Sequence, residues 1–187
     1  MLYIKAYPET AARVRLHGSD ILASPGMQKE RTLRQHDNVD CYTHSICVAY
    51  MSLRVARALH VKVDERSLVR GCLLHDYFLY DWHDKAQACR FHTVRHPRIA
   101  LHNAERDFPL NQLEREIILK HMFPLCFPFP HNRECYIISV ADKICAFSES
   151  FHLYSLDKVA RMIEEGSRPG EHVGGLCHAG PLPHSGH

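Results

Sequence analysis

The pair His75–Asp76 stands at the centre of a spaced set of residues that are suited to binding metal ions. The other members lie before and after this pair in the chain: His44, His96, His121 and Asp142. Imidazole nitrogens and carboxylate oxygens suit Mn, Fe, Zn, Co and Ni, and the two oxygens of a carboxylate can bridge two cations. The pair at 75 and 76 is the expected bridging point, so a fold that uses the whole set must bring five separate segments together.

Apolar residues at three- and four-residue steps predict helices through most of the chain. Residues 44–60 carry such a face, made of Cys47, Val48, Met51, Val55 and Leu59. Residues 65–76 place Leu68 and His75 on one face, which puts the His75–Asp76 pair at a helix end. A further helix is predicted over 133–151, where Asp142 lies beside a long apolar stripe.

The two segments around His96 are predicted to differ in structure. Residues 78–93 have no clean period and many polar or aromatic side chains, which predicts a loop with one short helical turn. A loop beside metal ligands often lines or gates a substrate site. His96 precedes Pro97, and a proline favours the first helical position, so we expect His96 to be the N-cap of a helix that runs to about 106.

The segment around His121 carries signals for both ends of a helix. Asn111 is expected to cap it, with Glu114 three residues later completing a capping-box arrangement. His121 follows Ile117 by one turn and is expected near the end of the same helix. Prolines at 124, 128 and 130 then prevent the helix from continuing. The apolar loop 123–130 is interpreted either as a dimer contact or as a lid.

The two ends of the chain are less regular. Residues 20–36 are predicted to form one helix, with Pro25 near its start. The stretch from 167 onward is rich in Gly, Pro and His and lacks an apolar period, which is typical of a flexible tail. The predicted organisation is therefore an N-terminal extension over 1–19, one domain over 20–166 and a flexible C-terminal tail over 167–187.

Composition is that of a small enzyme with one domain. The chain has 187 residues, 45% of them hydrophobic, which is enough to bury a core and enclose a pocket. A formal net charge of +2 provides no field that would steer nucleic acid or a membrane surface to the protein. We therefore expect neither as a partner.

The eight cysteines and the apolar segments indicate the compartment. The cysteines are spread singly without a CxxC motif, so Cys47, Cys72 and Cys145 are interpreted as buried thiols in a reducing compartment. The first residues lack the features of a secretory signal, and no segment approaches the roughly 18 apolar residues of a membrane span. A cytoplasmic location is the expectation.

Five ordered segments carry a resemblance to a known family. They read YTHSICVAYMSLRVA, GCLLHDYF, HPRIALHNAE, IILKHMFP and SVADKICAFSE, and each holds one or two of the candidate ligands. The pattern H…HD…H…H…D resembles the HD-domain superfamily of metal-dependent phosphohydrolases, over roughly residues 30 to 150. The resemblance implies an all-α fold, a compact helical bundle of the HD-domain type. The cyclic-dinucleotide phosphodiesterase branch is disfavoured, because no GYP motif is present and Leu79 stands where that branch has lysine.

The resemblance also implies how the ligands are shared between two divalent metal ions. His44, His75, Asp76 and Asp142 would hold the first ion, and Asp76, His96 and His121 the second. The ion type stays open among Mn, Fe, Co, Mg, Ni and Zn. Water activated by the metal ions would be the nucleophile that cleaves a phosphomonoester or phosphoanhydride of a small molecule, and a nucleotide is the expected substrate. The competing interpretation of each histidine is a side chain that caps a helix or bonds a backbone carbonyl.

Residues beyond the ligands are assigned from their positions beside the ligand segments. Asp76, Lys143 and His36 are the candidate catalytic residues, with Lys143 pairing with phosphate as a point charge and His36 touching phosphate or acting as an acid. The alternative for both is an ordinary side chain with no role in catalysis. Further phosphate contacts (Arg34, Lys85, Arg95) and base-stacking aromatics (Tyr77, Tyr80, Trp82, Phe91) are named on position alone.

Two other functions compete with the phosphohydrolase. A similar set of six ligands supports di-iron oxygenases within the same superfamily, and such a protein would consume oxygen. A metal-binding or nucleotide-binding module without turnover would bind its ligands and release no product. Fold-level likeness cannot choose among these three.

Overall fold

The structure of the protein, a computed structural model, describes residues 7–36, 39–83, 92–150 and 156–166. Within these residues the elements are the helices α1 (Pro8–Leu22), α2 (Pro25–Lys29), α3 (Cys41–Ala58), α4 (Glu65–Leu74), α5 (His92–Asp107), α6 (Gln112–Lys120), α7 (Arg133–Ser150) and α8 (Leu156–Glu165), the 3-10 turn η1 (Glu30–Thr32), and the strands β1 (Arg34–His36) and β2 (Val39–Asp40). The two strands form one short antiparallel pair. The prediction of an all-α bundle is confirmed.

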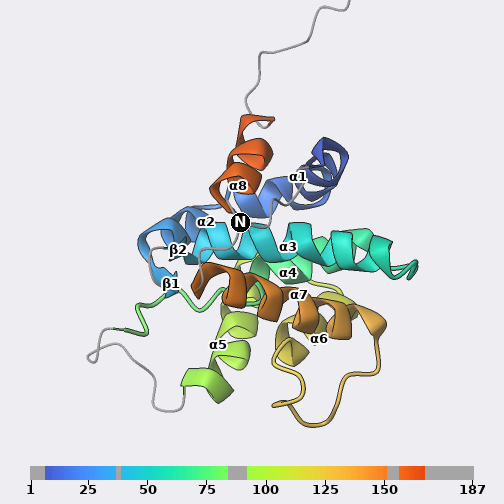
Figure 1. The fold of residues 1–187 in the computed structure, drawn as a ribbon. Helices are drawn as coiled ribbons and strands as arrows, with labels where there is room; N and C mark the ends of the chain where they lie inside the picture. The colour runs from blue at the N-terminus through green and yellow to red at the C-terminus, as the bar shows by residue number, and fades with distance from the viewer. Residues whose placement is uncertain (1–6, 37–38, 84–91, 151–155, 167–187) are drawn as a thin grey trace, which may run out of the picture.

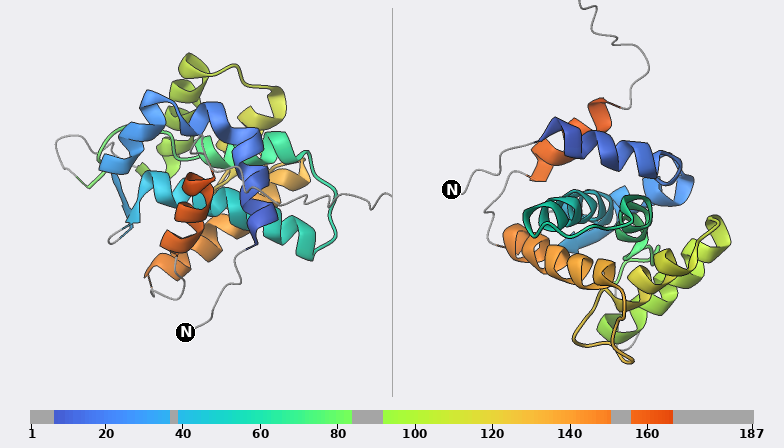
Figure 2. Two further views of the ribbon diagram at one scale, coloured as in Figure 1. Left: turned by 90° about the horizontal axis from the view of Figure 1, so that it is seen from above. Right: turned by 90° about the vertical axis from the view of Figure 1, so that its right-hand side faces the viewer.

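Helices α3 and α4 form the middle of the bundle and pack against each other (Figures 1 and 2). α1 and α8 cover one side of this pair, and α6 and α7 lie on the other side. α5 packs chiefly against α6. Buried apolar side chains from these helices join in one continuous core. Each helix that carries a candidate ligand contributes side chains to this core.

Helix starts agree with the local chemistry of the sequence. Asp40 caps α3 by accepting a hydrogen bond from the backbone of Thr43, and Asp64 caps α4 in the same way. Asn111 and Glu114 form the predicted capping box at the start of α6. These caps fix where each helix begins, and so fix which residues reach the interior.

A glycine allows α4 and α6 to approach each other closely. A Cβ atom added at Gly71 would lie 2.5 Å from a side-chain carbon of Ile117, a distance that real Cβ atoms do not show. Because Gly71 lies one turn before His75, and Ile117 one turn before His121, this contact sets the spacing of the two helix ends that carry those histidines.

The prediction of one helix over 20–36 is wrong. α1 ends at Leu22, Ser24 caps the short α2, and the chain then passes through η1 into β1. Pro25 stands at the start of α2, where a proline is well tolerated, so it starts a new helix here and does not continue α1. At the end of the segment, residues 34–36 pair as β1 with β2, and this pairing overrides their helical tendency.

The prediction that His96 is an N-cap is also wrong. α5 begins at His92 and holds Pro97 inside the helix. Pro97 is the sixth residue of α5, beyond the first turn, where it removes one backbone hydrogen bond. His96 consequently lies within the helix, and its side chain is buried rather than aimed outwards.

The two ends of the chain contribute helices that were not expected. α1 buries Ala11, Val14 and Ile21 in the core, although residues 1–19 were predicted to be an extension. α8 buries Val159 and Ile163 in the same core, and no helix was predicted for it. The domain limits at 20 and 166 stay predictions. The tail over 167–187 lies outside the described residues, as do positions 84–91 of the predicted loop over 78–93.

The described cysteines are free thiols, and Cys47, Cys72 and Cys145 are buried, as predicted. Among the helices of the described residues, none combines the length and the apolar character needed to cross a membrane.

Candidate metal centre

Six side chains from five helical segments converge in the interior. His44 is the fourth residue of α3, and His75 and His121 are the C-cap residues of α4 and α6. Asp76 follows His75, His96 comes from α5, and Asp142 comes from α7. Five of these residues are buried, and Asp142 is the partly exposed one, with 16% of its side chain accessible. The fold thus brings together every residue of the set that the sequence singled out.

Asp76 lies between two groups of these side chains, one at each carboxylate oxygen. Its Oδ2 atom is 3.4 Å from Nε2 of His75 and 4.0 Å from Nε2 of His44. Its Oδ1 atom is 3.2 Å from Nε2 of His96 and 3.6 Å from Nε2 of His121. The two oxygens therefore face different pairs of imidazoles.

Asp142 completes the group at Oδ2. Its Oδ1 atom lies 3.2 Å from Nε2 of His44 and 3.8 Å from Nε2 of His75. Ligand atoms of His44, His75 and Asp142 all lie within 4.8 Å of one another, as do those of His75, Asp76 and His121. At the other oxygen, the Nε2 atoms of His96 and His121 are 2.9 Å apart.

The Nδ1 atoms of three of these histidines are bound to acceptors that have no proton to give. His75 Nδ1 lies 2.7 Å from the carbonyl oxygen of Cys72, and His121 Nδ1 lies 2.8 Å from that of Ile118. His44 Nδ1 lies 2.8 Å from a carboxylate oxygen of Glu149. Each Nδ1 must donate in these contacts, so the Nε2 atoms that face the centre are the ones available as metal ligands.

Two atoms of the centre are buried without a hydrogen-bond partner among the described residues. They are Nε2 of His75 and Oδ1 of Asp76. Burying a polar atom without a partner costs free energy, and a cation bound to the lone pair of the nitrogen or of the oxygen removes that cost. The C-terminal ends of α4 and α6 also meet here, and the negative end of a helix favours a cation. The donor set fits divalent metal ions.

The carboxylates of the centre remain charged despite their burial. Burial alone would raise the pKa of Asp76, but His75 and then His96 outweigh it and hold that pKa well below its ordinary value. The pKa of Asp142 is also lowered, because His44 and then His75 outweigh the effect of burial, which alone would raise it. Both oxygen donors are therefore ionised at neutral pH.

The histidines divide into two kinds. Burial, and then the charge of His75, lower the pKa of His121 to about 3, so its ring is neutral. Burial would also lower the pKa of His44, but Glu149 and Asp142 raise it well above its ordinary value, and Asp76 raises that of His75 in the same way. A metal ion at the Oδ2 side of Asp76 therefore competes with protons for these two rings.

Comparison with known families agrees with this geometry. A family model, described as the HD domain, matches residues 41–146, which is more than half of the chain. This chain belongs to the HD domain family. The matched region begins at the first residue of α3 and ends within α7, so it includes all six residues of the centre. No curated protein and no solved structure matched the chain in the two further comparisons.

Membership supports a general statement of activity. HD domains are in general metal-dependent phosphohydrolases that bind divalent metal ions and act on small molecules. The His and Asp groups of this HD domain are of the kind that can hold such ions. Substrate, number of ions and identity of the ions do not follow from membership.

Two buried residues outside the matched region contact residues of the centre and were not predicted from the sequence. Glu149 contacts His44, and Gln35 donates from Nε2 to Oδ2 of Asp76 at 2.6 Å. Glu149 follows Asp142 by seven residues, two helical turns on one face, and this spacing is a signal that sequence analysis can use. Gln35 lies in β1, within a segment predicted to be helical, and gave no such signal.

The structure describes the side chain of only one of the two candidate catalytic residues outside the ligand set. The ammonium of Lys143 donates to the backbone carbonyls of Phe123 and Ser139, at 2.8 and 3.1 Å. The side chain of His36 lies outside the described residues. Roles for both stay predictions, and Lys143 would have to leave these carbonyls to reach a phosphate.

The other proposed substrate contacts also differ in their exposure. Arg34 and Arg95 are exposed, while Lys85 and Phe91 lie outside the described residues. Tyr77 is buried and donates from its hydroxyl to Asp107, so its ring packs in the interior. Tyr80 and Trp82 are half-buried. The ring of Tyr80 packs against Phe78 and that of Trp82 against His83, with centroids 5.2 and 3.8 Å apart.

Proposed function

We propose that this HD domain is a phosphohydrolase that holds two divalent metal ions and cleaves a phosphomonoester or phosphoanhydride of a nucleotide. The observation that carries the proposal is the position of Asp76, whose two oxygens face two different groups of nitrogen ligands. A carboxylate in this position is suited to bridging a pair of cations. His44, His75 and Asp142 would complete the first ion site, and His96 and His121 the second.

The residues of the centre have distinct tasks in this proposal. Ions bound there would lower the pKa of water so that a nucleophile exists at neutral pH, and would offset charge on the phosphate oxygens. The Nδ1 contacts keep the Nε2 lone pairs directed at the centre. The ionised carboxylates of Asp76 and Asp142 balance the charge of the cations in a buried site. Asp142 is also the most exposed of the six, which supports entry of the phosphate beside α7.

A run of aromatic residues near the centre supports a nucleotide as substrate. The ring of Phe78 packs edge-on against His96, with centroids 6.2 Å apart, and Tyr80 packs against Phe78 at 5.2 Å. Tyr80 and Trp82 are partly exposed beyond these contacts. Aromatic faces bind nucleobases by stacking, which is worth about 1–3 kcal/mol per base. A base held there would lie close to the His96 side of the centre.

The proposal is tested by metal analysis together with a phosphate-release screen. Freshly purified protein is analysed by plasma mass spectrometry and assayed against nucleotides with Mn²⁺, Co²⁺, Mg²⁺ or Fe²⁺, with and without oxygen. We expect two ions per chain, phosphate release that needs no oxygen, and loss of activity in Asp76→Ala. Glu105→Ala, which removes an exposed carboxylate from α5, serves as the control and should keep full activity.

Other outcomes would reject the proposal in separate ways. Two irons with oxygen uptake and no phosphate release would indicate a di-iron oxygenase. Bound metal and nucleotide without product would indicate a binding module. A wild-type chain that takes up no metal would remove the dinuclear site altogether.

A further inference from the structure

The segment that follows Asp76 adopts a conformation that its own sequence does not favour. Leu79 has a positive φ of 62°, a left-handed backbone conformation that residues other than glycine rarely adopt. The backbone N–H of Phe78 donates to the carbonyl of Asp76 at 2.7 Å, so the chain turns sharply directly after the candidate bridging residue. Strained backbone of this kind persists only where its surroundings hold it in place.

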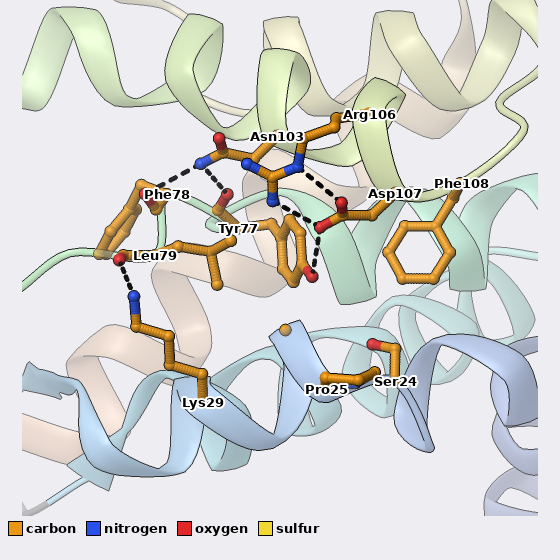
Figure 3. A pocket seen from close by; sticks show the side chains of 11 residues that line it. Ser24, Pro25, Lys29, Tyr77, Phe78, Leu79, Asn103, Arg106, Asp107 and Phe108 are labelled. Carbon is orange, nitrogen blue, oxygen red and sulfur yellow. Dashed lines mark hydrogen bonds and ion pairs between the residues drawn. The ribbon is translucent and has the colours of Figure 1, made fainter.

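Three side chains hold this segment, and Figure 3 shows the hydrogen bonds of two of them, Asn103 and Lys29. The side-chain amide of Asn103 donates to the carbonyls of Tyr77 and Phe78, at 3.1 and 3.0 Å. Lys29 donates to the carbonyl of Leu79 at 2.9 Å, and the N–H of Leu79 donates to Glu30 at 3.3 Å. Asn103 and Lys29 also line a pocket of about 850 Å³, which none of the six candidate ligands lines.

Asn103 differs from the other two because its helix also carries a candidate ligand. His96 and Asn103 are seven residues apart on α5, which places them on the same face, two turns from each other. His96 reaches Oδ1 of Asp76 at 3.2 Å, while Asn103 binds the two carbonyls that come next in the chain. Lys29 and Glu30 come from the other side of the segment and hold its far end.

α5 has limited contact with the middle of the bundle. It packs chiefly against α6, and its contact with α4, the helix that leads to Asp76, is much smaller. The Asn103 amide therefore provides a direct polar connection between α5 and the turn that carries Asp76. We therefore expect a change in this connection to alter the spacing of His96 from Asp76.

We propose that Asn103 is a positioning residue for the second ion site, because it fixes α5, and with it His96, relative to Asp76. This inference rests on the proposed dinuclear centre. Residues that orient metal ligands from outside the coordination sphere typically change metal affinity by roughly 10- to 100-fold when they are removed. The effect expected here is confined to one of the two sites.

The experiment compares Mn²⁺ binding by wild-type protein, Asn103→Ala, Asn103→Asp and the control His102→Ala. Asp has nearly the size of Asn but cannot donate to the two carbonyls, and His102 is an exposed neighbour on α5. Calorimetric titration gives the affinity of each site, and electron paramagnetic resonance reports whether two Mn²⁺ ions share one centre. Circular dichroism records the folded fraction of each variant.

We expect both Asn103 variants to bind the first ion as wild type does and the second about 10- to 100-fold more weakly, with loss of the spin-coupled signal. His102→Ala should behave as wild type. Equal binding of both ions by wild type and Asn103→Ala would overturn the inference alone. Equal loss of both ions in the folded variants would overturn it too, since it would indicate a general structural role. A wild-type chain that binds fewer than two ions would overturn the dinuclear proposal and this inference with it.

Discussion

The Nδ1 atom of His44 lies 2.8 Å from Oε1 of Glu149, a contact that connects the first turn of α3 to the last turn of α7. Both side chains are completely buried. A carboxylate behind a ligating histidine fixes the orientation of the ring and increases its basicity. Glu149 is therefore expected to support the first ion site although it does not face the centre itself.

Removing that carboxylate should weaken the first ion site. We expect Glu149→Ala to lower metal affinity at this site by roughly 10- to 100-fold, because His44 loses the acceptor that orients it. Glu149→Gln should lose less, since an amide oxygen still accepts from Nδ1. Calorimetric titration measures both, and Glu165→Gln, at an exposed position of α8, is the control. An affinity for Glu149→Ala equal to that of wild type would contradict the role assigned to this contact.

The contact of Gln35 with Asp76 should also matter for metal binding. Cys41 donates to Oε1 of Gln35 at 3.2 Å, which leaves Nε2 directed at Asp76. Gln35→Met keeps much of the volume and removes the donor, so metal affinity should fall by roughly 10- to 100-fold. Gln112→Met makes the same change at an exposed position and should have no effect. Titration with Mn²⁺ decides the matter, and equal affinities for the two variants would contradict the prediction.

Metal removal should destabilise the fold. A metal ion at a free concentration 100 times its Kd stabilises the folded state by about 2.7 kcal/mol. A chain of this size gains about 2–4 °C in Tm per kcal/mol of stability. Chelation should therefore lower the Tm by about 5–10 °C, measured by differential scanning calorimetry. Asp76→Ala should show little dependence on added metal. A wild-type Tm that is the same with and without chelator would argue against metal ions that stabilise the fold by binding at the centre.

Glu30 should make the stability of the metal-free protein depend on pH. Burial, and then the charge of Asp76, raise the pKa of Glu30 to about 8 from an ordinary value of 4.5. The folded state thus favours the protonated carboxyl. Its stabilising effect is complete below 4.5 and is lost as the pH rises through 8.

Glu30→Gln removes this titration and keeps an acceptor for the N–H of Leu79. Between pH 5 and 8, the free energy of unfolding of wild type should fall relative to that of Glu30→Gln by at least about 1.4 kcal/mol, the equivalent of one pKa unit. Urea unfolding in the presence of chelator measures the difference. Parallel pH profiles for the two proteins would show that Glu30 is ionised in the fold.

The close approach of α4 and α6 at Gly71 should not tolerate a methyl group. We expect Gly71→Ala to lower the free energy of unfolding by about 1–3 kcal/mol through overpacking against Ile117. The double variant Gly71→Ala, Ile117→Ala should show a favourable coupling, because the second change returns space to the first. Chemical unfolding of the four proteins in this cycle measures the coupling, and additive effects would contradict the packing explanation.

The sequence predicted the parts of the centre that depend on local structure. Helical periodicity and the Asn111 capping box placed His75 and His121 at helix ends, where the structure has them. The same local signals misplaced His96. Pro97 favours a helix start, but α5 begins five residues earlier, at His92, so a general preference gave the wrong boundary.

Contacts between distant segments were not accessible from one sequence. Gln35 reaches Asp76 only because β1 pairs with β2, and Asn103 reaches the 77–79 backbone only because of how α5 lies on the bundle. Gln35 carries no periodic or capping signal. Glu149 and Asn103 do carry a periodic signal, because each lies seven residues after a candidate ligand, Asp142 and His96 respectively, on the same helix face.

The C-cap histidines of α4 and α6 share one local design. In each, Nδ1 donates to the carbonyl three residues earlier, a group that the helix end would otherwise leave without a partner. The orientation of these two rings is thus decided within a single turn of helix, unlike that of His44, which depends on a residue 105 positions away. A histidine placed at the end of an unrelated helix should therefore adopt the same ring orientation without a second partner engineered for it. This arrangement can be transferred to other helices to build new metal sites.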